Sequence, residues 1–279
     1  MLHLRVLDVG ANLHAFREAV DALWQRRALI VEMTKRELTD RYAGQALGVA
    51  WAVIAPALMM ATYLFTFTFI FHGRLSAADN GTDYMAYVLG GLVPWLGLQE
   101  GLSRSTTAIV ASANLVKQIV FPGEILPMKV ALATIPGLFI GLVFALGMAA
   151  IAGRLSVLGV FVLLPIAVFF YCIMLAGFSY MLSSVGVFLR DVKDLIGFFL
   201  SIGLFLHPVL YPPGAAPAWL SYMFYLSPFS HMIWCFRSAL IGDHSHPLSW
   251  IIFPLASIVI FLLGWRTFRM LKPSFGNAL

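Results

Sequence analysis

Six apolar runs, each long enough to cross a lipid bilayer, constrain this chain more than any other feature. A bilayer core needs about 20 consecutive apolar residues per helix, and short polar segments separate the runs here. We therefore predict an all-α integral membrane protein, one domain over residues 1–279, with six transmembrane helices. The predicted spans are Leu47–Phe71, Tyr84–Val110, Leu126–Ala152, Val157–Leu189, Leu195–Tyr211 and Trp250–Phe268.

The composition excludes a soluble fold. Hydrophobic residues make up 61% of the chain and charged residues only 11%, whereas soluble domains average about half and a quarter. The net charge of +5 does not indicate nucleic-acid binding, because the basic residues lie at the ends of the apolar runs. They fit contacts with membrane lipids instead.

The distribution of lysine and arginine predicts the orientation. With six spans and a cytoplasmic N-terminus, only Arg74, Arg154 and Arg237 of the 18 basic residues lie outside, so both termini are expected to be cytoplasmic. A seventh span over Leu220–Gly242 would move the basic C-terminal end outside. We therefore predict that residues 213–246 form an outer re-entrant or interfacial helical hairpin before the last span.

The first residues do not resemble a cleaved signal peptide. Arg5, Asp8 and Arg17 interrupt any apolar core there. Cys172 and Cys235 each lie inside an apolar run and are interpreted as small buried residues without a disulfide or a redox role.

Residues 14–44 have the pattern of an amphipathic helix along the cytoplasmic interface. Trp24, Val31 and Leu38 recur at helical spacing. Its polar face carries both signs of charge, which favours a docking surface for a partner over an anchor held only by basic residues and anionic lipid. Glu32 with Arg36 and Glu37 with Arg41 are predicted i,i+4 pairs. The docking residues on this helix are Glu32, Lys35, Arg36, Glu37 and Arg41.

The motif FPGEILP, residues 121–127, follows a short amphipathic stretch between the second and third spans. Pro122 opposes continuation of that stretch as a helix, and Pro127 suits the first turn of the next one. We interpret residues 112–125 as a stiff cytoplasmic elbow carrying a coupling helix; a plain tight turn is the alternative. The docking residues assigned to it are Asn114, Lys117, Gln118, Phe121 and Glu124.

Candidate pathway residues lie in the first two spans. Glu100 and Arg104 share a helix face, either as a structural ion pair or at the entrance of a translocation path. Tyr63, Phe67 and Phe71 form an aromatic stripe that could stack on sugar rings or simply face lipid. The outer aromatic residues are interpreted as an outer gate or an interfacial belt, and they are Tyr211, Trp219, Tyr222 and Tyr225.

Motifs of enzymes are missing from the sequence. It has no G-x-x-x-x-G-K-[ST] phosphate-binding loop, no H-E-x-x-H, no C-x-x-C and no G-x-S-x-G. His244 and His246 in an outer loop are a weak metal-site candidate, and we predict no metal and no cofactor bound by this chain. A membrane-embedded enzyme acting on lipid would need converging carboxylates or histidines. An ion-coupled carrier would show internal repeats and midplane charges.

Five motifs in order carry a family resemblance. KRELTDRYAGQALGVAWAVIAPALMM (35–60) resembles the opening of bacterial polysaccharide-export permeases of the ABC-2 type, with "KR-x-L-x-x-RY" leading into "LG-x-x-W-x-x-x-x-P". FPGEILP resembles their "FP-x-E-x-x-P" element. FLRDVKDLIGFFLSIGLFLHPVLYPP (188–213) and SPFSHMIWCFRSALIGD (227–243) are similar to the two segments that precede the last span. Ser227 stands where the family has asparagine, which affects only that local cap.

The resemblance covers nearly the whole chain and implies its function. It indicates the transmembrane subunit of an O-antigen exporter in the bacterial inner membrane, working as a homodimer with two cytoplasmic ATPase subunits that use ATP and magnesium. The cargo implied is a lipid-linked cell-surface polysaccharide. Capsule or teichoic acid export is the neighbouring alternative, and a drug or lipid exporter of the ABC-2 class is another.

Overall fold

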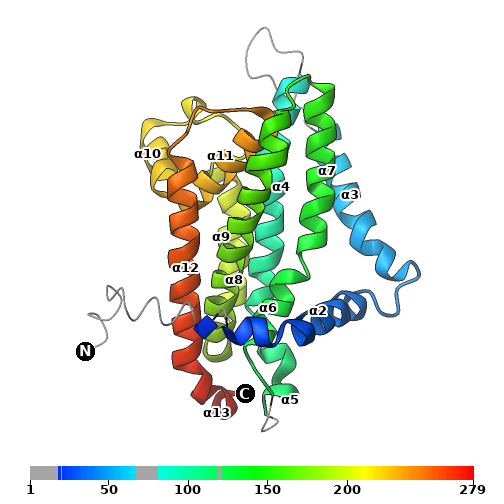
Figure 1. The fold of residues 1–279 in the computed structure, drawn as a ribbon, viewed down its shortest axis with the longest axis vertical. Helices are drawn as coiled ribbons and strands as arrows, with labels where there is room; N and C mark the ends of the chain where they lie inside the picture. Colours follow the sequence, from blue (N-terminus) through cyan, green and yellow to red (C-terminus); the bar gives the residue numbers. More distant parts are fainter. Residues whose placement is uncertain (1–17, 20, 67–80, 118–120) are drawn as a thin grey trace.

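The architecture is a bundle of long helices with short helices at both ends (Figure 1). The computed structural model describes residues 18, 19, 21–66, 81–117 and 121–279. Every regular element in these residues is helical, as predicted. The main elements are α2 (Arg27–Arg41), α3 (Trp51–Phe65), α4 (Thr82–Ser105), α5 (Ala113–Val116), α6 (Ile125–Leu132), α7 (Ile135–Ile151), a π-helical turn (Gly159–Leu163), α8 (Leu164–Phe188), α9 (Val192–Leu206), α10 (Ala218–Leu226), α11 (Pro228–Ile241), α12 (Ser249–Leu271) and α13 (Phe275–Ala278).

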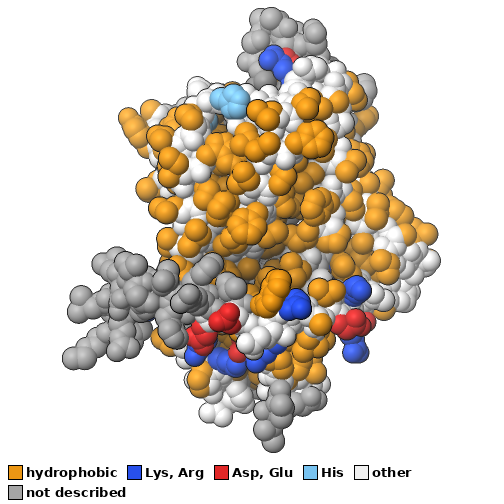
Figure 2. All heavy atoms as spheres, viewed as in Figure 1, with side chains coloured by type: hydrophobic (Ala, Val, Ile, Leu, Met, Phe, Trp, Pro, Cys, Tyr) orange, Lys and Arg blue, Asp and Glu red, His pale blue; other side chains and the backbone are white. Residues whose placement is uncertain are grey.

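Four stretches are long and apolar enough to cross a membrane, and each matches a predicted span. They are Gly48–Phe65, Ile125–Ile151, Gly159–Phe188 and Ser249–Ala278. Figure 2 shows hydrophobic side chains over the flank of the molecule and most of the visible charges in a band at the level of α2. The chain is therefore a membrane-spanning protein with an apolar belt.

The other two predicted spans are not confirmed. α4 has 24 residues but carries Asp83, Glu100 and Arg104, which lower its hydropathy. α9 has 15 residues and ends at Leu206, because a proline at position 208 disfavours helical backbone in the residue before it. The sequence pattern continued that span to Tyr211, so it missed this break.

Residues 213–246, predicted as an outer hairpin, contain α10 and α11. α10 has nine residues and lies partly exposed. α11 has 14 residues and is buried along nearly its whole length against α4 and α12. The second half of the hairpin is thus an internal element of the bundle, which explains why the segment is so apolar without being a span.

Of residues 14–44, predicted as an amphipathic interface helix, residues 18, 19 and 21–25 and those of α2 are helical, and α2 lies across the lower end of the bundle (Figure 1). Ile30 is the residue of α2 that is buried in the protein. Trp24 and Val31, from the predicted apolar stripe, are exposed, whereas Leu38 is half-buried. Apolar and polar residues are spread around α2 rather than separated on two faces, so the predicted amphipathic character is not confirmed.

The structure describes part of the predicted elbow, residues 112–125. α5 covers only Ala113–Val116, after a 3₁₀ turn over Val110–Ser112, and residues 118–120 lie outside the described residues. Glu124 immediately precedes α6, and Pro127 lies in the first turn of α6 as expected. A second break separates α6 from α7, where Pro136 lies in the first turn of the new helix.

The tightest helix pair in the core is α8 with α12, where Gly177 and Gly264 bring the backbones together. A Cβ on Gly264 would overlap the carbonyl oxygen of Gly177. We expect Gly264→Ala to lower stability by about 1–3 kcal/mol, because backbone cannot yield as a side chain does. Thermal unfolding of the detergent-purified protein would measure this loss.

Gly147→Ala on α7 is the matched control, because no heavy atom lies within 4 Å of a Cβ added there. It should leave the melting temperature unchanged or slightly raised, since alanine favours helix over glycine. Equal melting temperatures for the two variants would contradict close backbone contact between α8 and α12.

Candidate functional site

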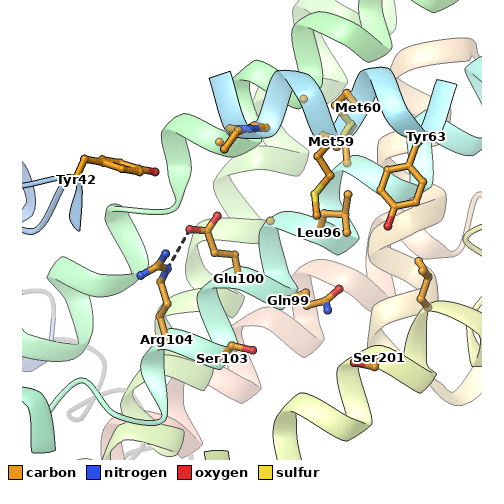
Figure 3. Close-up of a pocket in the computed structure, with 17 residues that line it drawn as sticks. Tyr42, Met59, Met60, Tyr63, Leu96, Gln99, Glu100, Ser103, Arg104 and Ser201 are labelled. Atoms are coloured by element: carbon orange, nitrogen blue, oxygen red, sulfur yellow. Dashed lines mark hydrogen bonds and ion pairs between the residues drawn. The ribbon is translucent and has the colours of Figure 1, made fainter. Parts of the chain in front are cut away.

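A cavity of about 710 Å³ lies between α3, α4, α7 and α9 (Figure 3). Apolar side chains form much of its wall, among them Pro56, Met59, Met60, Val93 and Leu96. Polar and charged side chains gather elsewhere in the lining, and these are Tyr42, Gln99, Glu100, Ser103, Arg104 and Ser201. A cavity with an apolar wall and a few grouped polar side chains is the usual form of a ligand site.

Close packing of α4 on α7 shapes one wall of this cavity. A Cβ on Gly141 of α7 would lie 2.8 Å from the Cγ1 atom of Val93 on α4, so only glycine permits this approach. α3 packs chiefly against α7 and buries only Met60. The cavity therefore has one firm wall, formed by α4 and α7, and one loosely held wall, formed by α3.

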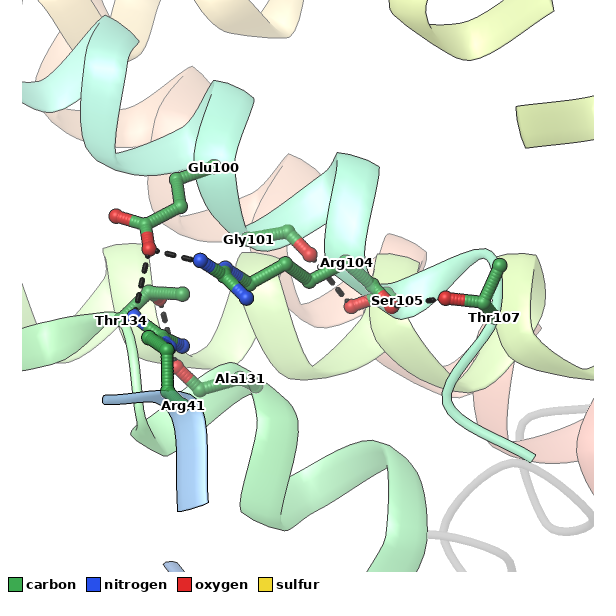
Figure 4. Close-up of polar contacts among 8 residues, drawn as sticks. All are labelled: Arg41, Glu100, Gly101, Arg104, Ser105, Thr107, Ala131 and Thr134. Carbon is green, nitrogen blue, oxygen red and sulfur yellow. Dashed lines mark hydrogen bonds and ion pairs between the residues drawn. The ribbon is translucent and has the colours of Figure 1, made fainter. Parts of the chain in front are cut away.

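Three charged side chains meet at the polar part of the cavity (Figure 4). The Oε1 atom of Glu100 accepts hydrogen bonds from Nη1 of Arg41 at 2.8 Å and from Nε of Arg104 at 3.0 Å. The predicted Glu100–Arg104 contact is thus confirmed, and Arg41 joins it from α2. One carboxylate is shared by two guanidinium groups, so the cluster has a net charge of +1 and favours a second anionic group.

Arg41 is the most enclosed member of this cluster. Its side chain is only 10% exposed, and its Nε and Nη2 atoms have no hydrogen-bond partner among the described residues. An enclosed guanidinium with free donors depends strongly on the one carboxylate that it contacts. The structure shows Arg41 in contact with Glu100 of α4, and its role at a partner interface stays a prediction.

A second ion pair joins α2 to the bundle one helical turn earlier. Nζ of Lys129 on α6 lies 2.8 Å from Oε2 of Glu37. The predicted pairs Glu32–Arg36 and Glu37–Arg41 are therefore wrong: Arg36 contacts Asp40 at 3.5 Å instead. An i,i+4 pair on an exposed helix contributes only a few tenths of a kcal/mol, so tertiary partners in a partly buried place outcompete it.

Five of the predicted docking residues lie at the surface. Glu32, Lys35 and Arg36 are exposed on α2, and Asn114 and Lys117 are exposed on and beside α5. Phe121 is half-buried, and Gln118 lies outside the described residues. The structure thus leaves three charges of α2 and the α5 segment available for contact with a partner.

Glu124 lies at the centre of a cytoplasmic hub. Its Oε2 atom is 3.0 Å from Nη1 of Arg26, and its Oε1 atom is 2.5 Å from Nζ of Lys272. The hydroxyl of Tyr180 donates a hydrogen bond to its backbone oxygen at 3.0 Å. One side chain therefore joins the N-terminal helical segment, the elbow and the end of α12.

The electrostatics of the hub keep Glu124 ionised. Burial alone would raise the pKa of this carboxyl, but the hydrogen bond from Lys272 and the charges of Lys272 and Arg26 outweigh it, and the net pKa is lowered. A buried, paired carboxylate of this kind fixes the position of the segments that supply its partners. Glu18 and Arg269 form a further ion pair between the same two ends of the chain.

Comparison with known proteins decides the family. The family described as "ABC-2 type transporter" matches residues 28–241, which is most of the chain. The chain belongs to the ABC-2 type transporter family. Its relatives include an "O-antigen export system permease protein RfbA" of Myxococcus xanthus, 26% identical over 88% of this chain and 92% of the relative. A protein of the same name from Klebsiella pneumoniae is 25% identical over 90% of this chain and 95% of the relative.

In this ABC-2 transporter chain the aromatic predictions have mixed positions. Tyr63 lines the cavity, whereas Phe67 and Phe71 lie outside the described residues. Tyr211 is half-buried, and its hydroxyl donates to the backbone oxygen of Phe205. Trp219, Tyr222 and Tyr225 are exposed, and their role as an outer gate or an interfacial belt stays a prediction.

The two loop histidines of this ABC-2 transporter chain contact other side chains. His246 stacks on Trp234 with ring centroids 3.9 Å apart, and Nδ1 of His244 lies 3.2 Å from the hydroxyl of Ser238. Burial lowers the pKa of His246, which favours the neutral ring that stacks there. Through these contacts both rings pack against neighbouring side chains near the α11–α12 connection.

Sequence reasoning missed the partners of the predicted residues in this ABC-2 transporter chain. Lys129 gave the clearest signal, because a charge inside an apolar run requires an opposite charge nearby. Arg26 and Lys272 gave none, since their partner Glu124 is 98 and 148 residues away in the chain. Arg237 was counted only as one of three basic residues on the outer side, although it is the most deeply buried cation described.

Proposed function

We propose that this chain is the membrane subunit of an ATP-driven exporter of a lipid-linked cell-surface polysaccharide of the O-antigen type. It acts in the bacterial inner membrane, with both termini on the cytoplasmic side. The observation that carries the proposal is the near full-length match to two permeases named for O-antigen export. The membrane spans and the cavity are consistent with that role.

The chemistry of the cavity supports an amphiphilic cargo. Its methionine and leucine wall suits an acyl or prenyl chain, and the net positive cluster of Arg41, Glu100 and Arg104 suits an anionic group at the end of that chain. Tyr63 offers a ring on which a sugar can stack. A polysaccharide attached to a lipid presents all three chemistries.

A second copy of this chain completes the pathway in our proposal. α3 buries only Met60, and exposed Val53, Leu58 and Met59 lie along it. A helix attached on one side needs a further apolar surface, either lipid or protein. In a homodimer the α3 sides of two copies would meet, and the two cavities would form one path.

Two copies of a cytoplasmic ATPase subunit supply the energy in this proposal. They bind ATP and magnesium, and their movement reaches the membrane subunit through the exposed charges of α2 and the α5 segment. The ion pairs Glu37–Lys129 and Arg41–Glu100 link α2 to α6 and α4. A push on α2 would therefore move one wall of the cavity directly.

Co-purification from native membranes tests the proposal. The unmodified chain is expected to bring down an ATP-hydrolysing subunit. Lys35→Glu with Arg36→Glu on α2 should reduce that yield about tenfold or more, because reversing exposed interface charges creates repulsion. Both side chains are exposed, so the variant should insert and accumulate normally.

The matched control is Arg154→Glu at the other end of the molecule, in the loop that follows α7. It should leave the ATPase yield unchanged. Repeated purification of the chain without any ATPase activity would contradict the exporter proposal. Loss of surface polysaccharide other than O-antigen on deletion would redirect the cargo to capsule or teichoic acid, and loss of a lipid or drug efflux would favour those exporters.

A further inference from the structure

Arg237 on α11 is a cation enclosed entirely by protein, with 0% of its surface exposed. Its Nε atom donates to the backbone oxygen of Tyr87 at 2.9 Å, Nη1 to that of Pro208 at 2.7 Å, and Nη2 to that of Val209 at 2.5 Å. Its guanidinium carbon lies 3.5 Å from the centre of the Tyr87 ring. One side chain thus joins α11, α4 and the segment after α9.

The segment that Arg237 contacts is where α9 stops. A helix of 15 residues is about 22 Å long, shorter than the hydrocarbon core of about 30 Å. Backbone groups that leave a helix at such a depth must find partners inside the protein. The break after Leu206 therefore needs donors for its carbonyl groups.

Side chains of two helices donate hydrogen bonds to four consecutive backbone carbonyls after the break. Arg237 donates to the backbone oxygens of Pro208 and Val209. The hydroxyl of Tyr84 donates to Leu210 at 3.0 Å, and that of Tyr87 donates to Tyr211 at 3.5 Å. These donors come from α4 and α11, so the break holds its shape only while both helices stay in place.

α4 leaves room for the arginine at two adjacent glycines. A Cβ on Gly91 would lie 2.8 Å from Nη2 of Arg237, and one on Gly90 would lie 3.1 Å from its Cγ. Two neighbouring glycines weaken a helix. Their presence at this place follows from the volume that the arginine side chain occupies.

We propose that Arg237 is a positioning residue that latches the outer hairpin, α10 and α11, to α4 by holding the break between α9 and α10. Arg237 has no carboxylate partner among the described residues, and a buried cation of this kind is costly. An apolar side chain in its place would leave two carbonyls unpaired. The latch follows from these contacts alone. Its part in closing the export path rests on the proposed function.

Cys235 is a native reporter for this latch. It lies two residues before Arg237 on α11 and is 0% exposed. A membrane-impermeant maleimide added to right-side-out vesicles reaches it only when α11 leaves its place. Cys172 on α8 is replaced by alanine so that Cys235 is the single thiol.

The expected order of labelling rates follows the number of lost hydrogen bonds. Arg237→Met removes three donors and should raise the rate about tenfold, because local opening becomes more populated once carbonyls lose their partners. Arg237→Lys keeps a charge and some donors, and should give an intermediate rate. Arg154→Met, an exposed arginine paired with Asp83, is the control and should label like the parent.

Unchanged labelling in Arg237→Met protein that accumulates normally would overturn the latch. If that variant does not accumulate, Tyr84→Phe decides, since it removes a single hydroxyl from the same carbonyl row. A rise of about threefold is expected for it, in proportion to one hydrogen bond, and no rise would overturn the latch. Labelling needs neither cargo nor ATPase, so a failed latch is distinguishable from a failed export assignment.

Discussion

Glu100→Gln is expected to abolish export, because it leaves Arg41 and Arg104 side by side at the cavity without the carboxylate that both contact. Arg41 would lose its charged partner while its other nitrogens have none among the described residues. Removing one member of a partly buried ion pair should lower the free energy of unfolding by about 1–3 kcal/mol. Export of surface polysaccharide and thermal unfolding in detergent measure the two effects.

Glu32→Gln is the control for this experiment. Glu32 is exposed on α2, so its neutralisation should change stability by less than about 0.5 kcal/mol. Wild-type export and stability in Glu100→Gln would contradict a role for the cluster in either the path or the fold.

A double variant separates the two interpretations of the cluster. Glu100→Gln with Arg104→Gln removes a charge of each sign and leaves a single cation at Arg41. If stability and export both return toward normal, the cluster is a structural ion pair. If stability returns and export stays absent, the charged side chains themselves act on the cargo, as the cavity position of Glu100 and Arg104 suggests.

The predictable part of this fold is the part that local physics determines. The lengths of the apolar runs alone located four spans, because in lipid each backbone polar group must be hydrogen-bonded within a helix. The prolines of FPGEILP located the start of α6, because proline acts on its own backbone and that of its neighbour. These features need no knowledge of distant residues.

The missed features depend on partners far away in the sequence. α9 stops at Leu206 beside Pro208, but the donors that α4 and α11 supply to the carbonyls after the break cannot be identified from the sequence near it. α11 lacks the length of a span, yet it is buried, since the bundle surrounds it. The charges of α2 pair with Lys129 and Glu100 across the fold, where burial strengthens the interaction more than helical spacing does.

The same reasoning changes the interpretation of Glu124. The motif suggested a carboxylate offered to a partner, whereas only 9% of this residue is exposed and both its oxygens are engaged within the chain.

The lowered pKa of Glu124 means that its contribution to stability is present above the unfolded pKa of about 4.3 and is lost as the pH falls through the lower folded value. Below about pH 4 the unmodified protein should therefore lose stability as Glu124 becomes protonated. Glu124→Gln has no carboxylate to protonate and should not show this loss.

Glu124→Lys is expected to be the most damaging single change at the cytoplasmic side. It would place three cations together, since Arg26 and Lys272 both contact this side chain. We expect a loss of about 3–5 kcal/mol, as for a broken buried ion pair, and little accumulated protein. Membrane-fraction yield and unfolding in detergent measure the loss.

Reversing both ends gives the decisive comparison. Glu124→Lys with Lys272→Glu restores one attraction but leaves the new lysine beside Arg26, so only partial recovery of yield is expected. If the ion pairs of Glu124 act only by fixing the elbow within this chain, the amount of co-purified ATPase should recover together with the yield of the membrane subunit. Full yield with the ATPase still lost would mean instead that the carboxylate itself contacts the partner, and it would move the docking surface from the exposed residues of α2 and α5 to Glu124.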